Sequence, residues 1–86
     1  MPIVIDVDFQ LRWAVPVHVQ MRGYTRNRID GPDAALSALR CQWPSKDGPE
    51  FRLAILRCLR ALTQHGSAEL ARESFIEAAV AAKVLA

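Results

Sequence analysis

The chain has 86 residues, which leaves room for one domain, and a domain of this size buries only about 60 to 65% of its unfolded surface, so its stability margin is small. Hydrophobic residues make up 51% of the sequence and charged residues 23%, which is typical of a globular protein and excludes intrinsic disorder. The formal net charge of +2 is too small for a dedicated DNA-binding domain.

The sequence lacks the signals of membrane insertion and of secretion. No apolar run approaches the roughly 18 residues of a membrane span. The N-terminus also lacks the basic and then apolar pattern of a secretory signal. We therefore expect a cytoplasmic protein with no membrane partner.

The N-terminal part has the periodicity of β-structure, because every odd position from Ile3 to Met21 is apolar. One unbroken strand of this length would span about 60 Å, whereas the expected radius of gyration is about 12 Å. The run must therefore bend or extend beyond its own domain. We predict a strand over 13–21, with Val15, Val17 and Val19 pointing inward, and a further strand over 3–9. No Gly, Asn or Pro marks a turn between the two strands. Strand 3–9 therefore pairs either within its own subunit or with a strand of another subunit.

Gly23 supplies the turn to the next predicted strand, over 25–30. A two-residue loop would place Ile29 opposite Pro16. A three-residue loop instead pairs Ile29 with Val17 and Asn27 with Val19, which keeps the one aliphatic residue of this strand on the buried face. We prefer the second register.

That register gives the hairpin a basic outer face. Four arginines and no acid lie between Phe9 and Asp30, and arginine forks suit phosphate and carboxylate groups. The face could meet an acidic protein or weakly bind nucleic acid, although Tyr24 is the one aromatic side chain near it for base stacking. The candidate residues of this basic face are Arg12, His18, Arg22, Arg26 and Arg28.

Three helices are predicted after the hairpin, over 32–42, 50–64 and 68–84. Asp30 or Gly31 caps the first, the breaker loop around Pro44 and Pro49 precedes the second, and Ser67 caps the third. Apolar spacing predicts that the second helix turns inward Phe51, Ala54, Ile55, Cys58, Leu59 and Leu62. For the third helix it predicts Leu70, Ala71, Ser74, Phe75, Ala78, Ala81 and Ala82. The fold class is therefore α+β: an antiparallel hairpin, with two or three strands, packed against three helices in the order β(β)βααα.

Two further apolar stripes fall on the outer sides of the second and third helices. Scattered exposed leucines are ordinary, but two stripes in so small a domain exceed the usual expectation. Either the second helix is sandwiched within the fold, or the stripes join in a homodimer interface. The candidate self-association residues are Leu53, Leu56, Ile76, Val80 and Val84.

The common signatures of nucleotide-binding proteins, metalloproteases and hydrolases are absent. Cys41 and Cys58 are interpreted as buried thiols, because they lack the close spacing of metal or redox sites. Asp6 and Asp8 are interpreted as part of a solvated strand face. An enzymatic site would have to join Cys58 or His65 to distant acids. We therefore expect no enzyme, no cofactor and no metal, and instead an interaction module that forms a homodimer.

Several short segments together resemble the domain of unknown function 982, a family of short alpha-proteobacterial proteins. The segments are Pro16-Val17 with Val19, Asp33-Ala34 with Leu39, Trp43-Pro44, Ala54 with 58–62, Ala71-Arg72, and 75–79. The resemblance covers about 13–82 and rests on their order and spacing. It implies a fold and a bacterial cytoplasmic setting, and it carries no activity, cofactor or site residue.

Overall fold

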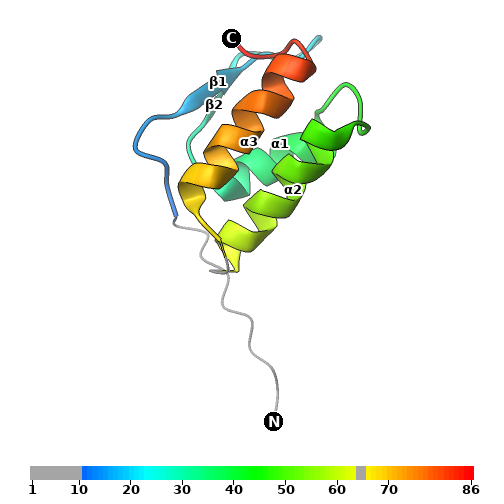
Figure 1. Ribbon diagram of the computed structural model, residues 1–86. Helices are drawn as coiled ribbons and strands as arrows, with labels where there is room; N and C mark the ends of the chain where they lie inside the picture. The colour runs from blue at the N-terminus through cyan, green and yellow to red at the C-terminus, as the bar shows by residue number, and fades with distance from the viewer. Residues whose placement is uncertain (1–10, 64–65) are drawn as a thin grey trace.

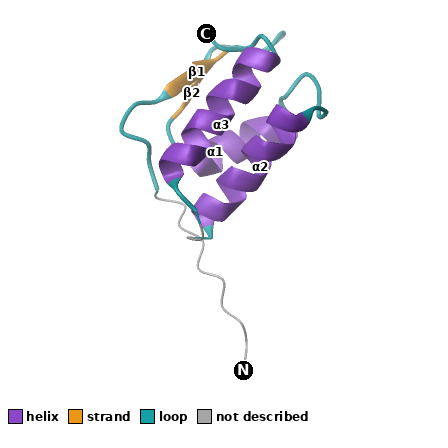
Figure 2. Cartoon of the chain, in the orientation of Figure 1, coloured by secondary structure: helices purple, strands orange, loops and turns teal. Residues whose placement is uncertain are grey.

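The computed structural model describes residues 11–63 and 66–86 of the chain. Its elements are β1 (Val17–Val19), β2 (Asn27–Ile29), α1 (Pro32–Cys41), α2 (Pro49–Leu62) and α3 (Ala68–Ala81). In Figure 1, α2 and α3 run antiparallel in front of α1, and the hairpin lies along α3. Figure 2 shows the same arrangement as two short strands beside a layer of helices. The predicted α+β class is confirmed, and the predicted strand over 3–9 lies outside the described residues.

The hairpin has the predicted register. β1 and β2 are antiparallel, with Val17 opposite Ile29, His18 opposite Arg28 and Val19 opposite Asn27. The inner side chains Val17, Val19 and Ile29 are buried against the helices. The apolar side of the hairpin therefore faces the core, as the alternation indicates.

Both strands are shorter than predicted, and the chain bends before β1. Val15 is 59% exposed, so the prediction that it points inward is wrong. Its carbonyl accepts a hydrogen bond of 2.8 Å from Arg72 Nε on α3 instead of joining a strand ladder. Alternation from Trp13 to Met21 thus runs across a bend, which periodicity alone does not reveal.

The core is centred on Phe75, which is fully buried on α3. The ring of Trp13 lies 5.9 Å from it and that of Trp43 lies 5.4 Å from it, both in tilted arrangements. The indole Nε1 of Trp13 donates to the carbonyl of Ala68 at 2.9 Å, so its polar group is satisfied. Trp13 thereby fixes the segment before β1 onto the start of α3.

The helix starts follow the predicted signals. Gly31 occupies the N-cap of α1 with Pro32 next to it, and Pro49 begins α2. The hydroxyl of Ser67 accepts a hydrogen bond from Leu70 N at the start of α3. Local capping chemistry therefore sets these three boundaries.

The end of α3 differs from the prediction, because the helix stops at Ala81 and does not continue to 84. Lys83 has a φ of 60°, Lys83 N bonds to Val80 O, and Val84 N bonds to Ala79 O. This pattern is a Schellman motif, in which the residue after the left-handed position packs back on the helix. Val84 is accordingly buried at 6% exposure, so its assignment to an outer self-association stripe is wrong.

After this turn the chain pairs with β1. Gln20 N donates to Val84 O at 2.8 Å and Ala86 N donates to His18 O at 2.9 Å, and Leu85 forms a bridge with Val19. Figure 1 shows the C-terminus beside β1. β1 therefore lies between β2 and the C-terminal segment, an arrangement that the sequence analysis did not predict.

The buried sides of α2 and α3 are also shifted from the predicted ones. Leu59 and Leu70 are exposed, contrary to prediction, and Ala61 and Ala79 are buried. α2 packs against both α1 and α3, so its buried arc is set by two neighbours instead of by the largest apolar side chains. Small residues fill the arc because they allow the helix axes to approach closely.

Candidate interaction surfaces

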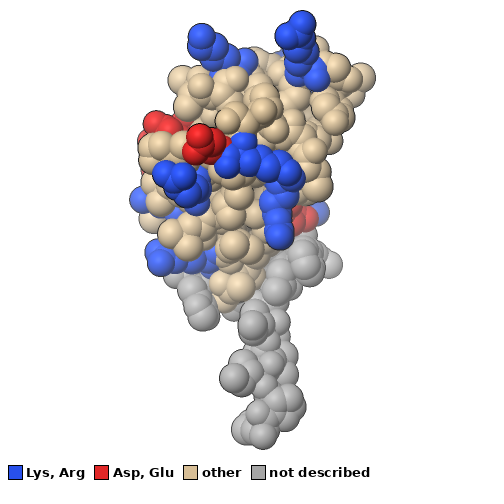
Figure 3. Space-filling view, turned by 90° about the vertical axis from the view of Figure 1, so that its right-hand side faces the viewer, with Lys and Arg blue, Asp and Glu red and all other residues tan. Residues whose placement is uncertain are grey.

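The outer side of α2 exposes apolar side chains. Leu56 and Leu59 are exposed and Leu53 is half-buried, so α2 is not sandwiched within the described part of the fold. Figure 3 shows the side of the molecule that is on the right in Figure 1 as a mostly uncharged surface, with Lys and Arg side chains and a few Asp and Glu side chains spread over it. These three leucines define the α2 patch.

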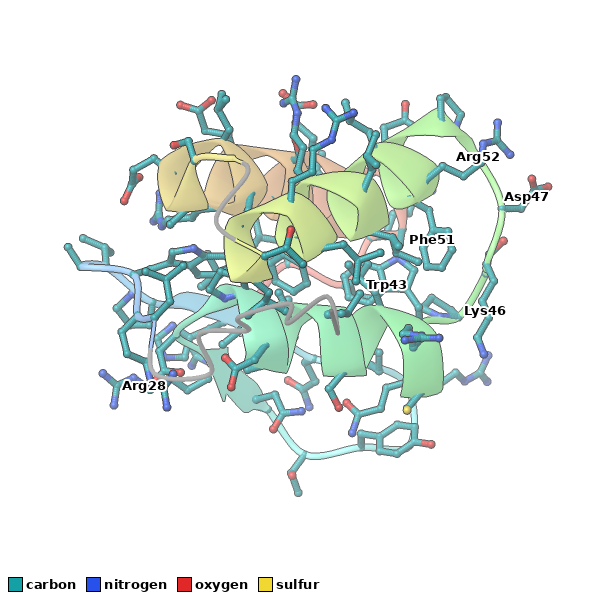
Figure 4. The ribbon with its side chains drawn as sticks, turned by 90° about the horizontal axis from the view of Figure 1, so that it is seen from below. Arg28, Trp43, Lys46, Asp47, Phe51 and Arg52 are labelled. Atoms are coloured by element: carbon teal, nitrogen blue, oxygen red, sulfur yellow. The ribbon has the colours of Figure 1, made fainter. Side chains whose placement is uncertain are left out.

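Two arginines beside the α2 patch are engaged by their own chain. Arg52 Nη1 lies 3.7 Å from Asp47 Oδ1, and Arg57 Nη1 donates to Ser74 Oγ on α3 at 2.8 Å. In Figure 4, Arg52 and Asp47 lie at the outside of the loop before α2, whereas Trp43 and Phe51 turn inward. Asp47 therefore partly balances the charge of Arg52, and Ser74 accepts one of the hydrogen bonds that Arg57 can donate.

The second predicted stripe, on α3, faces another direction. At about 100° per residue, Ile76 and Val80 lie roughly 160° and 120° around the axis from Ser74, which bonds to α2. Val80 is exposed and Ile76 is half-buried. With Val84 buried, the predicted self-association residues form two separate patches on one chain.

Most of the candidate residues of the basic face lie on the hairpin or next to it. His18 and Arg28 are directly opposite each other and alternate with buried neighbours, so they point away from the helices. Arg22, Arg26 and Arg28 are exposed. Figure 4 places Arg28 at the opposite end of the molecule from the loop that carries Lys46.

Arg12 is held by acids that follow β2. Its Nε lies 3.8 Å from Asp30 Oδ1 and its Nη1 lies 3.6 Å from Asp33 Oδ1. Asp30 and Asp33 lie just beyond the stretch of sequence that has four arginines and no acid. The fold brings both carboxylates back to Arg12. The basic face is therefore carried by the hairpin arginines more than by Arg12.

A hollow of about 370 Å³ adjoins the turn of the hairpin. Its wall combines two cationic side chains, Arg22 and Lys83, with Tyr24 and Pro44. Tyr24 is half exposed, and it is the large exposed aromatic side chain among the described residues. This hollow was not predicted, because Lys83 comes from the far end of the chain.

The two cysteines lie in different surroundings. Burial raises the pKa of Cys58 from 9.0 to about 12, so its thiol stays protonated at neutral pH and is a poor nucleophile. Cys41 is exposed, which corrects the prediction that both thiols are buried. His65 lies outside the described residues. Within the described ranges, no group of three or more His, Cys, Asp and Glu side chains is placed to hold a metal ion.

These features define a small α+β domain that presents apolar and basic surfaces around a packed core. The chain belongs to the family described as Protein of unknown function (DUF982), which matches residues 15–86. The resemblance inferred from the sequence is thereby confirmed. Comparison with curated proteins and with solved structures gives no match. In the part of the chain that the structure describes, no helix is long and apolar enough to cross a membrane.

Proposed function

We propose that this protein is a small, non-enzymatic interaction module that self-associates as a homodimer in the bacterial cytoplasm. The observation that carries the proposal is the α2 patch, where Leu56 and Leu59 are exposed beside Leu53 on a helix that is otherwise part of the core. Exposed apolar patches in soluble domains mark contact sites. A domain of this size also gains stability when further apolar surface is buried in a dimer.

Two substitutions on the helices test this proposal. Light scattering at micromolar concentration should give a dimer mass for the wild type and a monomer mass for Leu56→Glu, because a buried carboxylate in the interface is costly. Val80→Glu tests whether the α3 stripe takes part. Val15→Glu is the matched control, because Val15 is exposed and lies away from the α2 patch. A wild-type monomer that neither helix substitution affects would refute the dimer.

A second candidate function is weak binding of nucleic acid or of an acidic partner at the basic face. The hollow beside Arg22, Lys83 and Tyr24 favours it, because cationic side chains next to an exposed ring can hold phosphate and stack on a base. Fluorescence titration with single- and double-stranded oligonucleotides should show affinity that falls with added salt. Arg22→Glu should weaken it, and Arg40→Glu, an exposed arginine on α1, should not. Absence of binding at low salt would exclude nucleic acid.

A further inference from the structure

The hydrogen bonds of β1 show which backbone groups of β2 face outward. His18 O and Gln20 N bond to the C-terminal segment. Because backbone groups alternate in direction along a strand, Val17 and Val19 direct theirs to β2, and they pair there with Ile29 and Asn27. The N–H and C=O of Arg28 therefore point away from β1. Within residues 11–63 and 66–86, no backbone group bonds to them on that side.

A hollow accompanies this open edge. It measures about 210 Å³ and lies between β2 and α1. Ala34, Ser37 and Ala38 line it from α1, and Asn27 Nδ2 donates to Gln42 Oε1 at 3.0 Å beside it. The small side chains of α1 leave room for larger ones. A strand added along Arg28 would place every second side chain in this hollow and the others beside Arg26 and Arg28.

One segment of the chain has the matching pattern. In residues 3–9 the odd positions are Ile, Ile, Val and Phe, and the even positions include Asp6 and Asp8. Its apolar side suits the hollow. Its two aspartates are two residues apart, as are Arg26 and Arg28, so opposite charges can meet across the pair at the same spacing along both strands. The acids that this pairing needs occur in this segment, and the arginines occur on β2 and directly before it.

The direction of the chain at Leu11 points to a second copy. Trp13 N donates a hydrogen bond to Asp30 O. The carbonyl oxygen of Leu11 lies so close to Gly31 that a Cβ atom at residue 31 would be 2.5 Å from that oxygen. Residues 11–13 thus run antiparallel to 30–32, and the chain direction at Leu11 is away from Arg28. Reaching its own β2 edge would require a reversal near Gln10, where no Gly, Asn or Pro occurs.

We propose that residues 3–9 of one copy add as a strand to the outer edge of β2 in a second copy, reciprocally, in a twofold dimer. The backbone of Arg28 supplies the hydrogen bonds, and the hollow over α1 and the two arginines select the segment. An exposed strand edge is a ready template for such pairing. This contact uses other residues than the α2 patch and rests on the proposed self-association: both contacts belong to one twofold dimer that needs each of them. The charge reversals can therefore fail while Leu56→Glu still dissociates the dimer.

Reciprocal charge reversal in the full chain tests the proposal. Asp6→Arg/Asp8→Arg places arginines against arginines, and Arg26→Asp/Arg28→Asp places aspartates against aspartates, so each variant alone should lose the dimer by light scattering. Mixed one to one, the two variants should form a heterodimer, because both strand interfaces then join opposite charges. Glu73→Arg/Glu77→Arg, at exposed acids of α3, is the matched control and should leave the dimer intact.

Each outcome decides between the surfaces. Loss of the dimer in both reversed variants and its recovery on mixing supports strand exchange. Dimers that survive both reversals but dissociate with Leu56→Glu overturn it and leave the proposed function standing. A wild-type monomer overturns both. Two further variants, Asp6→Cys and Arg28→Cys, both carry Cys41→Ala. When they are mixed and oxidised, a disulfide should link the two chains. A disulfide that forms only within one doubly substituted chain would overturn the second copy as the occupant.

Discussion

Side chains of one type behave differently in this protein according to where the fold places them. Cys58 lies fully buried on α2, whereas Cys41 is exposed at the end of α1. Val84 is buried and Val80, one helical turn earlier, is exposed. Residue type predicts burial for both cysteines, and helical spacing predicts an outer stripe for both valines, but the neighbours of each residue decide its exposure.

Alkaline pH should destabilise the fold through Cys58. Below pH 9 the thiol is protonated in both states. Above pH 9.0 the unfolded chain loses the proton first, since burial raises the folded pKa to about 12. The free energy of unfolding should therefore fall between these values, by up to about 1.4 kcal/mol per pH unit. Urea denaturation at pH 7, 9, 10 and 11 measures this fall.

The control for this prediction is Cys58→Ala, which removes the titrating group and should show a shallower loss above pH 9. An equally steep loss in that variant would assign the pH dependence to other groups. Alkylation at pH 8 adds a second readout. Iodoacetamide should label the exposed Cys41 of the native protein, and Cys58 only after unfolding.

At the scale of elements, the helix starts follow from local sequence and the end of α3 does not. Pro32, Pro49 and Ser67 each mark a start by a mechanism that involves only nearby backbone groups. The Schellman motif after α3 is usually marked by Gly at its left-handed position. Here Lys83 holds that position, so the usual signal is missing and the alanine-rich pattern predicts a longer helix.

Replacing Lys83 by Gly should stabilise the protein. A φ of 60° is unfavourable for a residue with a Cβ and costs Gly nothing. We expect the free energy of unfolding to rise by about 0.5 to 1 kcal/mol. Thermal denaturation followed by circular dichroism measures the change. Lys83→Ala is the control, because it removes the charge of the side chain but keeps a Cβ at this position. Its free energy of unfolding should be close to that of the wild type. A rise equal to that of the glycine variant would argue against relief of backbone strain.

At the scale of the whole molecule, the C-terminal segment closes the fold. It returns from α3 to pair with β1 through Val84 O and Ala86 N, so the last residues of the chain lie beside the first strand. The hairpin is thus covered on one edge by residues more than 60 positions away in sequence. β2 is left as the other edge, and the proposed strand exchange depends on that asymmetry.

Truncation of Val84 should therefore cost more than truncation of Val80. Val84→Ala removes buried methyl groups where the C-terminal segment meets the core, and should lower the free energy of unfolding by about 2 kcal/mol. Val80→Ala, on the same part of the chain but exposed, should stay within about 0.5 kcal/mol of the wild type. Urea denaturation below the dimerisation concentration compares the two. Equal effects would mean that burial of the Val84 side chain adds nothing to stability.

The sequence by itself determined the α+β class, the family, the three helix starts and the register of Val17 with Ile29, because periodicity, capping and turn geometry act over a few neighbouring residues. Only the tertiary structure decided that Val15 turns outward, that Arg12 meets Asp30 and Asp33, that Val84 is buried and that β1 gains a second neighbour. Each of these depends on contacts between residues that are distant in sequence or on the packing of one helix against two others. Local pattern carries no information about which distant neighbour is present.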